Sequence, residues 1–171
     1  MTVLMVLAHP CPESFVAAVF ERAVAAVTAT DSIVECLDLY STGYVPGQPL
    51  APVDEAAVGR ASTLVLVYPT WWSSQPATLG AWLAAVAELD LSHIEQLVCV
   101  TTHGSGRIGN FLIGRAGRLT VAKTFRARCA SNATFRWIAC YGVDTRDAAH
   151  RAGFLSRIDD EFGAKGAISR R

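Results

Sequence analysis

Short apolar runs recur along the chain, and segments of helical periodicity lie between them. Residues 63–68 are apolar at nearly every position, without the two-residue alternation of a strand that is exposed on one face. We therefore expect a strand that is covered on both faces, and Pro69 should end it because proline cannot donate to a β-ladder. Similar runs predict four more strands, over residues 3–8, 33–39, 96–101 and 135–141.

Helical spacing fills the intervals between these strands. From Phe15 the apolar side chains recur every three or four positions, which predicts a helix to about Thr28. Residues 77–89 are apolar almost all round, so this helix should be buried on more than one side, and a second subunit could provide part of that cover. Further helices are expected from about Asp54, from about Asn110 toward Arg128, and over residues 145–162.

Five apolar strands that alternate with helices predict an α/β fold, with a three-layer, doubly wound, five-stranded parallel sheet in the order 2-1-3-4-5. We expect one domain over residues 1–171. Ligands of such sheets bind outside the carboxyl ends of the strands, where the strand order reverses. The segments after strands one, three and four (residues 9–14, 69–75 and 101–106) should therefore converge on one crevice.

Charge and cysteine content narrow the class of protein. Lys plus Arg and Asp plus Glu number 15 each, which favours neither nucleic acid nor a strongly anionic surface as a partner. The sequence shows no basic leader and no apolar run of the ~18 residues that a membrane span needs, so a cytoplasmic protein is expected. The five cysteines lack metal-binding spacing, and Cys36, Cys99 and Cys140 are expected to be buried thiols because they lie in apolar runs.

The first loop has two interpretations. His9, the Ser14 hydroxyl and backbone N–H groups could surround a phosphate at the beginning of the first helix, where the helix dipole favours an anion. Alternatively, Ser14 or Glu13 is an ordinary helix cap.

The third loop contains two adjacent tryptophans, Trp71 and Trp72. Both could fill the core. Two in a row just past a strand are difficult to bury together, so at least one is a candidate ligand contact. A flat heterocycle could lie there, with the N–H groups of Trp72 and Ser73 along one edge.

The fourth loop is rich in glycine, which allows backbone N–H groups to approach a ligand and to stabilise developing negative charge. A phosphate end, a planar end and an anion-stabilising end together describe a flavin nucleotide. The segment from Gly104 to Gly109 also matches the GxGxxG pattern, but the acidic residue expected roughly 20 positions later is absent. A nicotinamide-binding Rossmann fold is therefore a minor alternative.

The motifs of these loops follow one another in a familiar order: Ala8-His9-Pro10-x-Pro12-x-Ser14-Phe15, Asp38-Leu39-Tyr40, Tyr68-Pro69-Thr70-Trp71-Trp72 and Thr101-Thr102-x-Gly104-Ser105-Gly106. In these motifs the chain resembles the flavodoxin-like NAD(P)H:quinone oxidoreductases. This family includes bacterial NAD(P)H dehydrogenases and ancillary subunits of glutathione-gated potassium efflux systems.

The resemblance implies particular roles for the residues of the three loops. His9, Ser14 and Phe15 would hold the phosphate side of the flavin. Thr101, Thr102, His103 and Gly104 would line the N1 and O2 side. The ring itself would be bordered by Pro69, Thr70, Trp71, Trp72 and Ser73.

The resemblance also implies a reaction, in which a hydride passes from NAD(P)H through flavin N5 to a quinone or similar two-electron acceptor by a ping-pong mechanism. The cofactor would be FMN or FAD, and the protein would be a homodimer. Two other functions stay open: an ancillary flavoprotein that binds a partner such as a transporter with little turnover, and a one-electron carrier of the flavodoxin type. The motifs decide neither FMN against FAD nor NADH against NADPH.

The sequence departs from this family at the charge relay, because Gly109 and Arg115 stand where a tyrosine and a histidine are usual. His103 could replace them as a donor to flavin O2, and Arg115 could supply a fixed positive charge. For His103 itself we favour a solvated loop histidine. Arg107, Arg115 and Arg118 could bind the 2′-phosphate of NADPH, although a solvated helix face is favoured.

Overall fold

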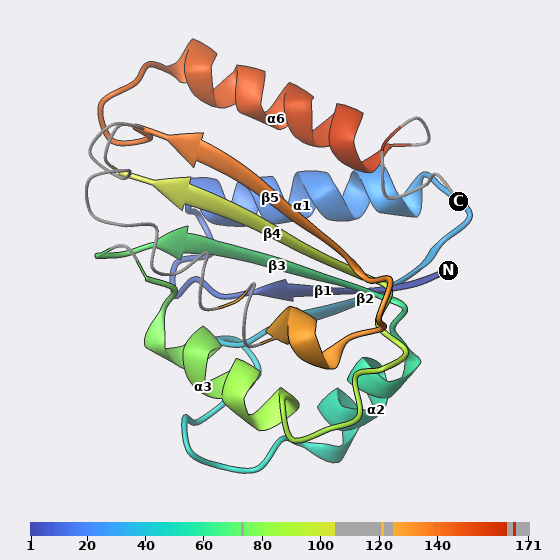
Figure 1. Cartoon of the computed structure of the whole chain (residues 1–171). Coiled ribbons are helices and arrows are strands. Elements are labelled where there is room, and N and C mark those ends of the chain that lie inside the picture. The colour runs from blue at the N-terminus through green and yellow to red at the C-terminus, as the bar shows by residue number, and fades with distance from the viewer. Residues whose placement is uncertain (73, 105–120, 122–124, 164–165, 167–171) are drawn as a thin grey trace.

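The computed structural model describes residues 1–72, 74–104, 121, 125–163 and 166. Five strands form one parallel sheet in the order β2-β1-β3-β4-β5 (Figure 1), which confirms the predicted order 2-1-3-4-5. The strands are β1 (Thr2–Leu7), β2 (Ile33–Asp38), β3 (Thr63–Thr70), β4 (Gln96–His103) and β5 (Thr134–Tyr141).

Helices cover both faces of this sheet, which gives the three layers that the alternation of strands and helices predicts (Figure 1). One face carries α1 (Phe15–Thr28) and α6 (Ala148–Phe162), and the other carries α2 (Pro52–Arg60) and α3 (Ala77–Val86). A short 3-10 helix, η2 (Arg126–Arg128), precedes β5. No helix within the described part of the chain is both long and apolar enough to span a membrane.

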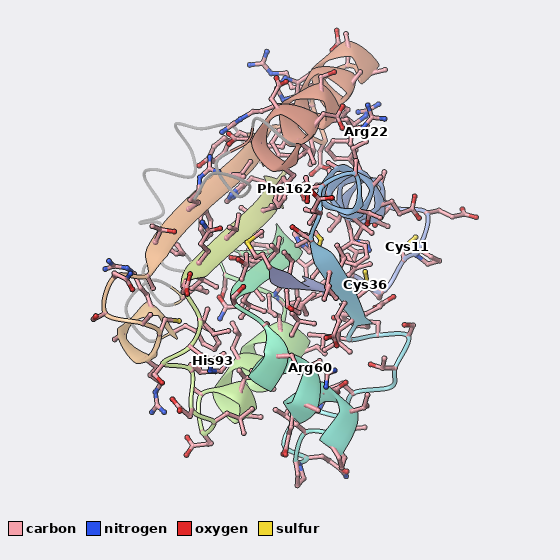
Figure 2. The ribbon with its side chains drawn as sticks, turned by 90° about the vertical axis from the view of Figure 1, so that its right-hand side faces the viewer. Cys11, Arg22, Cys36, Arg60, His93 and Phe162 are labelled. Atoms are coloured by element: carbon pink, nitrogen blue, oxygen red, sulfur yellow. The ribbon has the colours of Figure 1, made fainter. Side chains whose placement is uncertain are left out.

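The sheet divides the core into two halves, and this explains the uninterrupted apolar run of β3. Leu64, Leu66 and Tyr68 pack with α2 and α3, whereas Val65 and Val67 pack with α1 and α6. Successive side chains of a strand point to opposite faces, so a strand covered on both faces must be apolar at every position. On the second face, fully buried Phe162 lies at the end of α6 beside α1 (Figure 2).

Capping residues determine where two of the helices begin. The Ser14 hydroxyl accepts a hydrogen bond from the N–H of Ala17 at 3.1 Å, so α1 begins at Phe15 as predicted. The carboxylate of Asp147 accepts one from the N–H of His150 at 2.9 Å, and α6 consequently begins at Ala148 rather than at residue 145. The helix expected over residues 77–89 ends earlier, at Val86.

The prediction that Pro69 ends the third strand is wrong, because β3 continues to Thr70 and Pro69 pairs with Thr102 of β4. The carbonyl of Val67 accepts a hydrogen bond from Ala8, so Val67 faces β1, and Pro69 faces the same side two residues later. Pairing between β1 and β3 ends at Val67. The missing N–H of Pro69 therefore costs no ladder hydrogen bond, because on that side β3 has become an edge.

One of the three thiols expected to be buried is exposed. Cys99 and Cys140 are buried, whereas Cys36 is exposed. Cys36 lies on β2, an edge strand of the sheet (Figure 2). Periodicity alone does not reveal whether an apolar strand lies at the centre or at the edge of its sheet, and helices cover the edge less completely.

Candidate functional site

The first and third loops meet at the carboxyl ends of the strands. The His9 ring, after β1, lies 5.8 Å from the Trp71 ring, after β3, measured between ring centroids. These strands are neighbours in the sheet, at the point where the order of the strands reverses. The two loops thus form adjacent parts of one edge, at the arrowhead end of β3 and β4 in Figure 1.

The first loop is closed by local hydrogen bonds. The Cys11 N–H donates to Nδ1 of His9 at 3.0 Å, and Ser14 caps α1. The helix-cap alternative for Ser14 is therefore observed. It is compatible with anion binding, because Ser14 uses its oxygen as an acceptor while its O–H can still donate, and the first N–H groups of a helix have no partner within the helix. The ring of Phe15 lies 6.3 Å from that of Phe154 on α6, so Phe15 also serves the core.

The third loop is a tight turn that presents its aromatic rings to solvent. Two hydrogen bonds of 2.9 Å, from the N–H of Trp71 to the Ser74 carbonyl and from the N–H of Ser74 to the Trp71 carbonyl, close it. Trp71 is 42 % exposed and Trp72 is 100 % exposed. The core-filling alternative for this pair is therefore wrong. Ser73 lies outside the described residues.

The backbone of Trp72 adds a second unusual feature. Its φ is +50°, and it is the one residue other than glycine with a positive φ in the described part of the chain. Positive φ suits the two-residue turns that close hairpins, but a bulky side chain there is uncommon. Backbone conformations of this kind concentrate at ligand-binding sites. A fully exposed tryptophan in this conformation is therefore a strong candidate for a ligand contact.

The end of β4 forms a buried polar chain beside this turn. The Oγ1 atoms of Thr70 and Thr101 are 2.6 Å apart, and Nε2 of His103 lies 3.5 Å from Oγ1 of Thr70. Thr101, Thr102 and His103 are all buried. Since β4 extends to His103, the prediction of a solvated loop histidine is wrong, and these three residues belong to the strand rather than to the loop.

Burial also determines the charge of His103. The residue is 3 % exposed, and its ring stacks on that of Tyr141 with 4.6 Å between centroids and 18° between planes. Desolvation lowers the pKa of the imidazole from its ordinary value of 6.5 to about 4. At neutral pH the ring is uncharged and carries one N–H donor and one acceptor nitrogen. It can donate a hydrogen bond, but it does not supply a positive charge.

The loop between β5 and α6 closes the site on its far side. The N–H of Val143 donates to the His103 carbonyl at 3.0 Å. A Cβ atom added to Gly104 would lie 2.1 Å from Oδ2 of Asp144, so the missing side chain of Gly104 makes room for this carboxylate. Close approach of a neighbouring group is a common reason for a glycine in a loop.

Sequence reasoning missed two residues of this arrangement, Tyr141 and Asp144. The signal for Tyr141 is the register of the sheet, because Tyr141 pairs with His103 at the end of β5. Arg115, together with Gly109, Arg107 and Arg118, lies outside the described residues. Within the described part of the chain, no group of three or more His, Cys, Asp and Glu residues could hold a metal ion.

Comparison with a model of the flavodoxin-2 family, described as a flavodoxin-like fold, gives a match over residues 1–122. The chain therefore belongs to this family of flavodoxin-like proteins. A comparison with curated proteins found no match.

Solved structures share the fold at low sequence identity. Smu.1420 from Streptococcus mutans UA159 superposes with a TM-score of 0.80 and 18 % identity, over 93 % of this chain and 97 % of that one. The NAD(P)H:quinone oxidoreductase from Methanothermobacter marburgensis superposes with a TM-score of 0.79 and 22 % identity, over 100 % of this chain and 98 % of that one. An FMN-dependent NADH-azoreductase from Bacillus anthracis, in complex with FMN, superposes with a TM-score of 0.72 and 12 % identity, over 99 % of this chain and 100 % of that one.

Proposed function

We propose that the protein is a flavin-dependent NAD(P)H oxidoreductase that reduces a quinone or a similar two-electron acceptor by a ping-pong mechanism. The observation that carries this proposal is the fully exposed Trp72 in its closed turn, next to the polar chain of half-buried Thr70 with buried Thr101 and His103. A planar ligand can lie against the exposed rings while fixed donors address its edge. The quinone oxidoreductase and the FMN-dependent azoreductase with this fold support the same function.

The residues of the three loops would contact a flavin along its whole length. The beginning of α1, with His9, Ser14 and Phe15, would hold the phosphate. Pro69, Thr70, Trp71, Trp72 and Ser73 would border the ring, and Thr101, Thr102, His103 and Gly104 would line the N1 and O2 side. The cofactor would be FMN or FAD, and the FMN bound to the azoreductase favours FMN. When bound, a flavin accepts a hydride at N5 and passes it on.

The chain's own groups would orient the cofactor and respond to its charge. His103 is neutral at neutral pH, so it would act by donating a hydrogen bond toward O2. The 2.6 Å contact between Thr70 and Thr101 would keep both hydroxyls in place behind the ring. Arg115 would supply the positive charge that His103 does not provide. The exposed ring of Trp72 would be the surface on which a nicotinamide or a quinone is received.

We also propose a homodimer that uses the outer face of α3. This helix is apolar along its length, yet Ala77 and Ala84 are exposed. A helix that is apolar all round is expected to be buried on both sides. A second subunit would provide the missing cover.

The half-reactions test this function separately. The flavin-loaded protein is mixed without oxygen with NADH or NADPH, and then with a quinone. Loss of the oxidised flavin absorbance in the first step and its return in the second are expected, and initial-rate plots should give parallel lines. A His103→Gln variant should be slower. Arg60→Gln should match the parent protein, because Arg60 ends α2 just before β3 begins, at the opposite end of the sheet from the crevice.

The outcomes distinguish the candidate functions. Failure of both NADH and NADPH to reduce the bound flavin would contradict the proposed activity. Tight flavin binding with negligible turnover would instead favour the ancillary flavoprotein, and a stable one-electron reduced flavin on titration would favour the carrier.

A further inference from the structure

A second cleft lies between the end of β5 and helix α6. Its volume is about 550 Å³, within the range of pockets that hold small molecules. Its lining includes Tyr141, Arg146, His150, Gly153, Phe154 and Arg157. The loop from β5 to α6 lies at the same end of the sheet as the carboxyl ends of β3 and β4 (Figure 1). The cleft therefore lies at the ligand-binding end of the fold, outside the candidate crevice.

The cleft is cationic. Arg146 and Arg157 line it, and no carboxylate is among its lining residues, although acidic and basic residues are equal in number over the whole chain. Of the neighbouring carboxylates, Asp147 caps α6, whereas Glu161 pairs both with Arg136 and with Arg157 of the cleft. One shared carboxylate therefore stands beside the two cleft arginines. Such a local excess of positive charge attracts anions.

The two arginines differ in how they are held. Nε and Nη2 of Arg157 both donate to Oε1 of Glu161 at 3.4 Å, whereas its Nη1 has no partner among the residues that the structure describes. Arg146 folds back over Gly142, where an added Cβ would lie 3.3 Å from its Cγ. Its guanidinium has no hydrogen bond or ion pair with any residue that the structure describes. An arginine with unused donors at a cleft is suited to bind a phosphate or a carboxylate.

A catalytic interpretation of this cleft fails on its hydrogen bonding. Sγ of Cys140 lies 3.6 Å from Nε2 of His150, as in a cysteine–histidine pair. However, Nε2 also lies 3.0 Å from the carbonyl oxygen of Tyr141, which can only accept, so Nε2 carries a proton. It therefore cannot remove the proton of the thiol. The geometry is that of a binding site rather than of an activated nucleophile.

Tyr141 connects this cleft to the candidate crevice. It lines the cleft, and its ring stacks on His103 at 4.6 Å. Phe154 adds a second apolar surface on the α6 side. A ligand with a planar apolar part and an anionic part would thus find a partner for each.

We propose that the cleft binds a phosphate group of a nucleotide-sized ligand through Arg146 and Arg157. Two sources share this chemistry. One is the 2′-phosphate of NADPH, whose other end would reach the flavin, and this version rests on the proposed function. The other is a separate phosphorylated small molecule. In both cases the same two arginines would hold the phosphate.

Calorimetric titration of the protein with 2′,5′-ADP tests the binding site directly. We expect binding by the parent protein, and about tenfold weaker binding by Arg146→Gln and by Arg157→Gln, because a hydrogen bond to a charged group is worth about 1.5–3 kcal/mol. Arg60→Gln, which removes the same charge on α2, should bind like the parent. No binding by the parent, or equal weakening in all three variants, would overturn the proposal.

A steric variant provides an independent test. Gly153 of α6 lines the cleft, and a Cβ added there meets no atom within 4 Å, so Gly153→Leu should add bulk at the cleft without a clash at its Cβ. It should abolish binding of 2′,5′-ADP and leave the protein folded. Gly59→Leu is the matched control, because the space around Gly59 on α2 is equally open. If Gly153→Leu binds as the parent does, the ligand is not in this cleft.

The kinetics then identify the source. If the phosphate belongs to NADPH, Arg146→Gln raises the KM for NADPH and leaves that for NADH unchanged. If both KM values stay unchanged while 2′,5′-ADP binding is lost, the ligand is a separate molecule. The titration requires neither flavin nor turnover. If the protein binds 2′,5′-ADP but no flavin, the proposed function is refuted, whereas the proposed phosphate site in the cleft is supported.

Discussion

The two walls of the candidate crevice are built in opposite ways. The wall after β3 is a two-residue turn with Trp72 fully exposed and at positive φ. The wall at the end of β4 is buried and hydrogen-bonded, and its histidine is neutral. An exposed aromatic surface is free to contact a ligand, whereas a buried polar chain keeps its donors in fixed directions. The comparison suggests that one wall supplies contact and the other supplies orientation.

The largest expected effect concerns Trp82, which is fully buried on α3, unlike the exposed Trp72. Trp82→Ala should lower the free energy of unfolding by about 3–5 kcal/mol, as large-to-small changes in cores do. Nε1 of Trp82 is buried without a hydrogen-bond partner, so Trp82→Phe should cost far less. Denaturant unfolding measures both. A cost for Trp82→Phe equal to that for Trp82→Ala would show that ring packing is not what Trp82 contributes.

The polar chain should show strong coupling between its members. Thr101→Val leaves Thr70 without its 2.6 Å partner and should cost about 1–3 kcal/mol of stability. Replacing both residues by valine should cost less than the sum of the two single changes, because no hydroxyl is then left unpaired. Unfolding curves for the four proteins of this cycle give the coupling. Simple additivity would mean that the two hydroxyls act independently.

The buried histidine should make stability depend on pH. Because the pKa of His103 is about 4 in the folded protein and ordinarily 6.5, the unfolded chain binds a proton between these values that the folded chain does not. The free energy of unfolding should therefore fall as the pH is lowered from about 6.5 to about 4, and this contribution is fully present above pH 6.5.

His103→Gln isolates this effect, since glutamine does not titrate. The difference in unfolding free energy between the parent and His103→Gln should shrink or change sign as the pH falls through that range. Thermal or denaturant unfolding at several pH values measures the difference. A difference that stays constant would show that His103 is not buried in its neutral form.

The smallest expected effect concerns the backbone of the exposed wall. Trp72→Gly should be more stable than Trp72→Ala by about 1 kcal/mol, because glycine adopts positive φ without steric cost. Neither variant loses buried surface, since the side chain is fully exposed. If the flavin is held through the backbone N–H, Trp72→Gly should keep its affinity in a flavin titration. A large loss of affinity would assign the contact to the indole ring instead.

Periodicity predicts much of the fold because burial on two faces leaves a clear pattern. The run over β3 indicates its place in the sheet, and α1 begins and ends where its spacing and Ser14 predict. The errors concern position within the sheet. Pro69 stays in β3 because its neighbour β1 has already ended, and Cys36 is exposed because β2 is an edge. Neither fact is contained in the local sequence.

The candidate site is predictable to the same degree. The loops that converge can be read from strand order, but the contacts between their side chains depend on the register of the strands. His103 is buried because β4 runs on beside Thr70 and Tyr141, and this pairing joins residues that are distant in the sequence. The positions of Tyr141 and of the Asp144 carboxylate beside the site therefore follow only from the three-dimensional structure.

The central claim is that the crevice between the turn of Trp71 and Trp72 and the end of β4 binds a flavin. The most direct test is the absorbance spectrum of the purified protein, with the released cofactor identified by mass and quantified per chain. The account predicts a flavin spectrum and one FMN or FAD per chain, present as purified or restored by adding the cofactor. A colourless protein that takes up neither FMN nor FAD would contradict it.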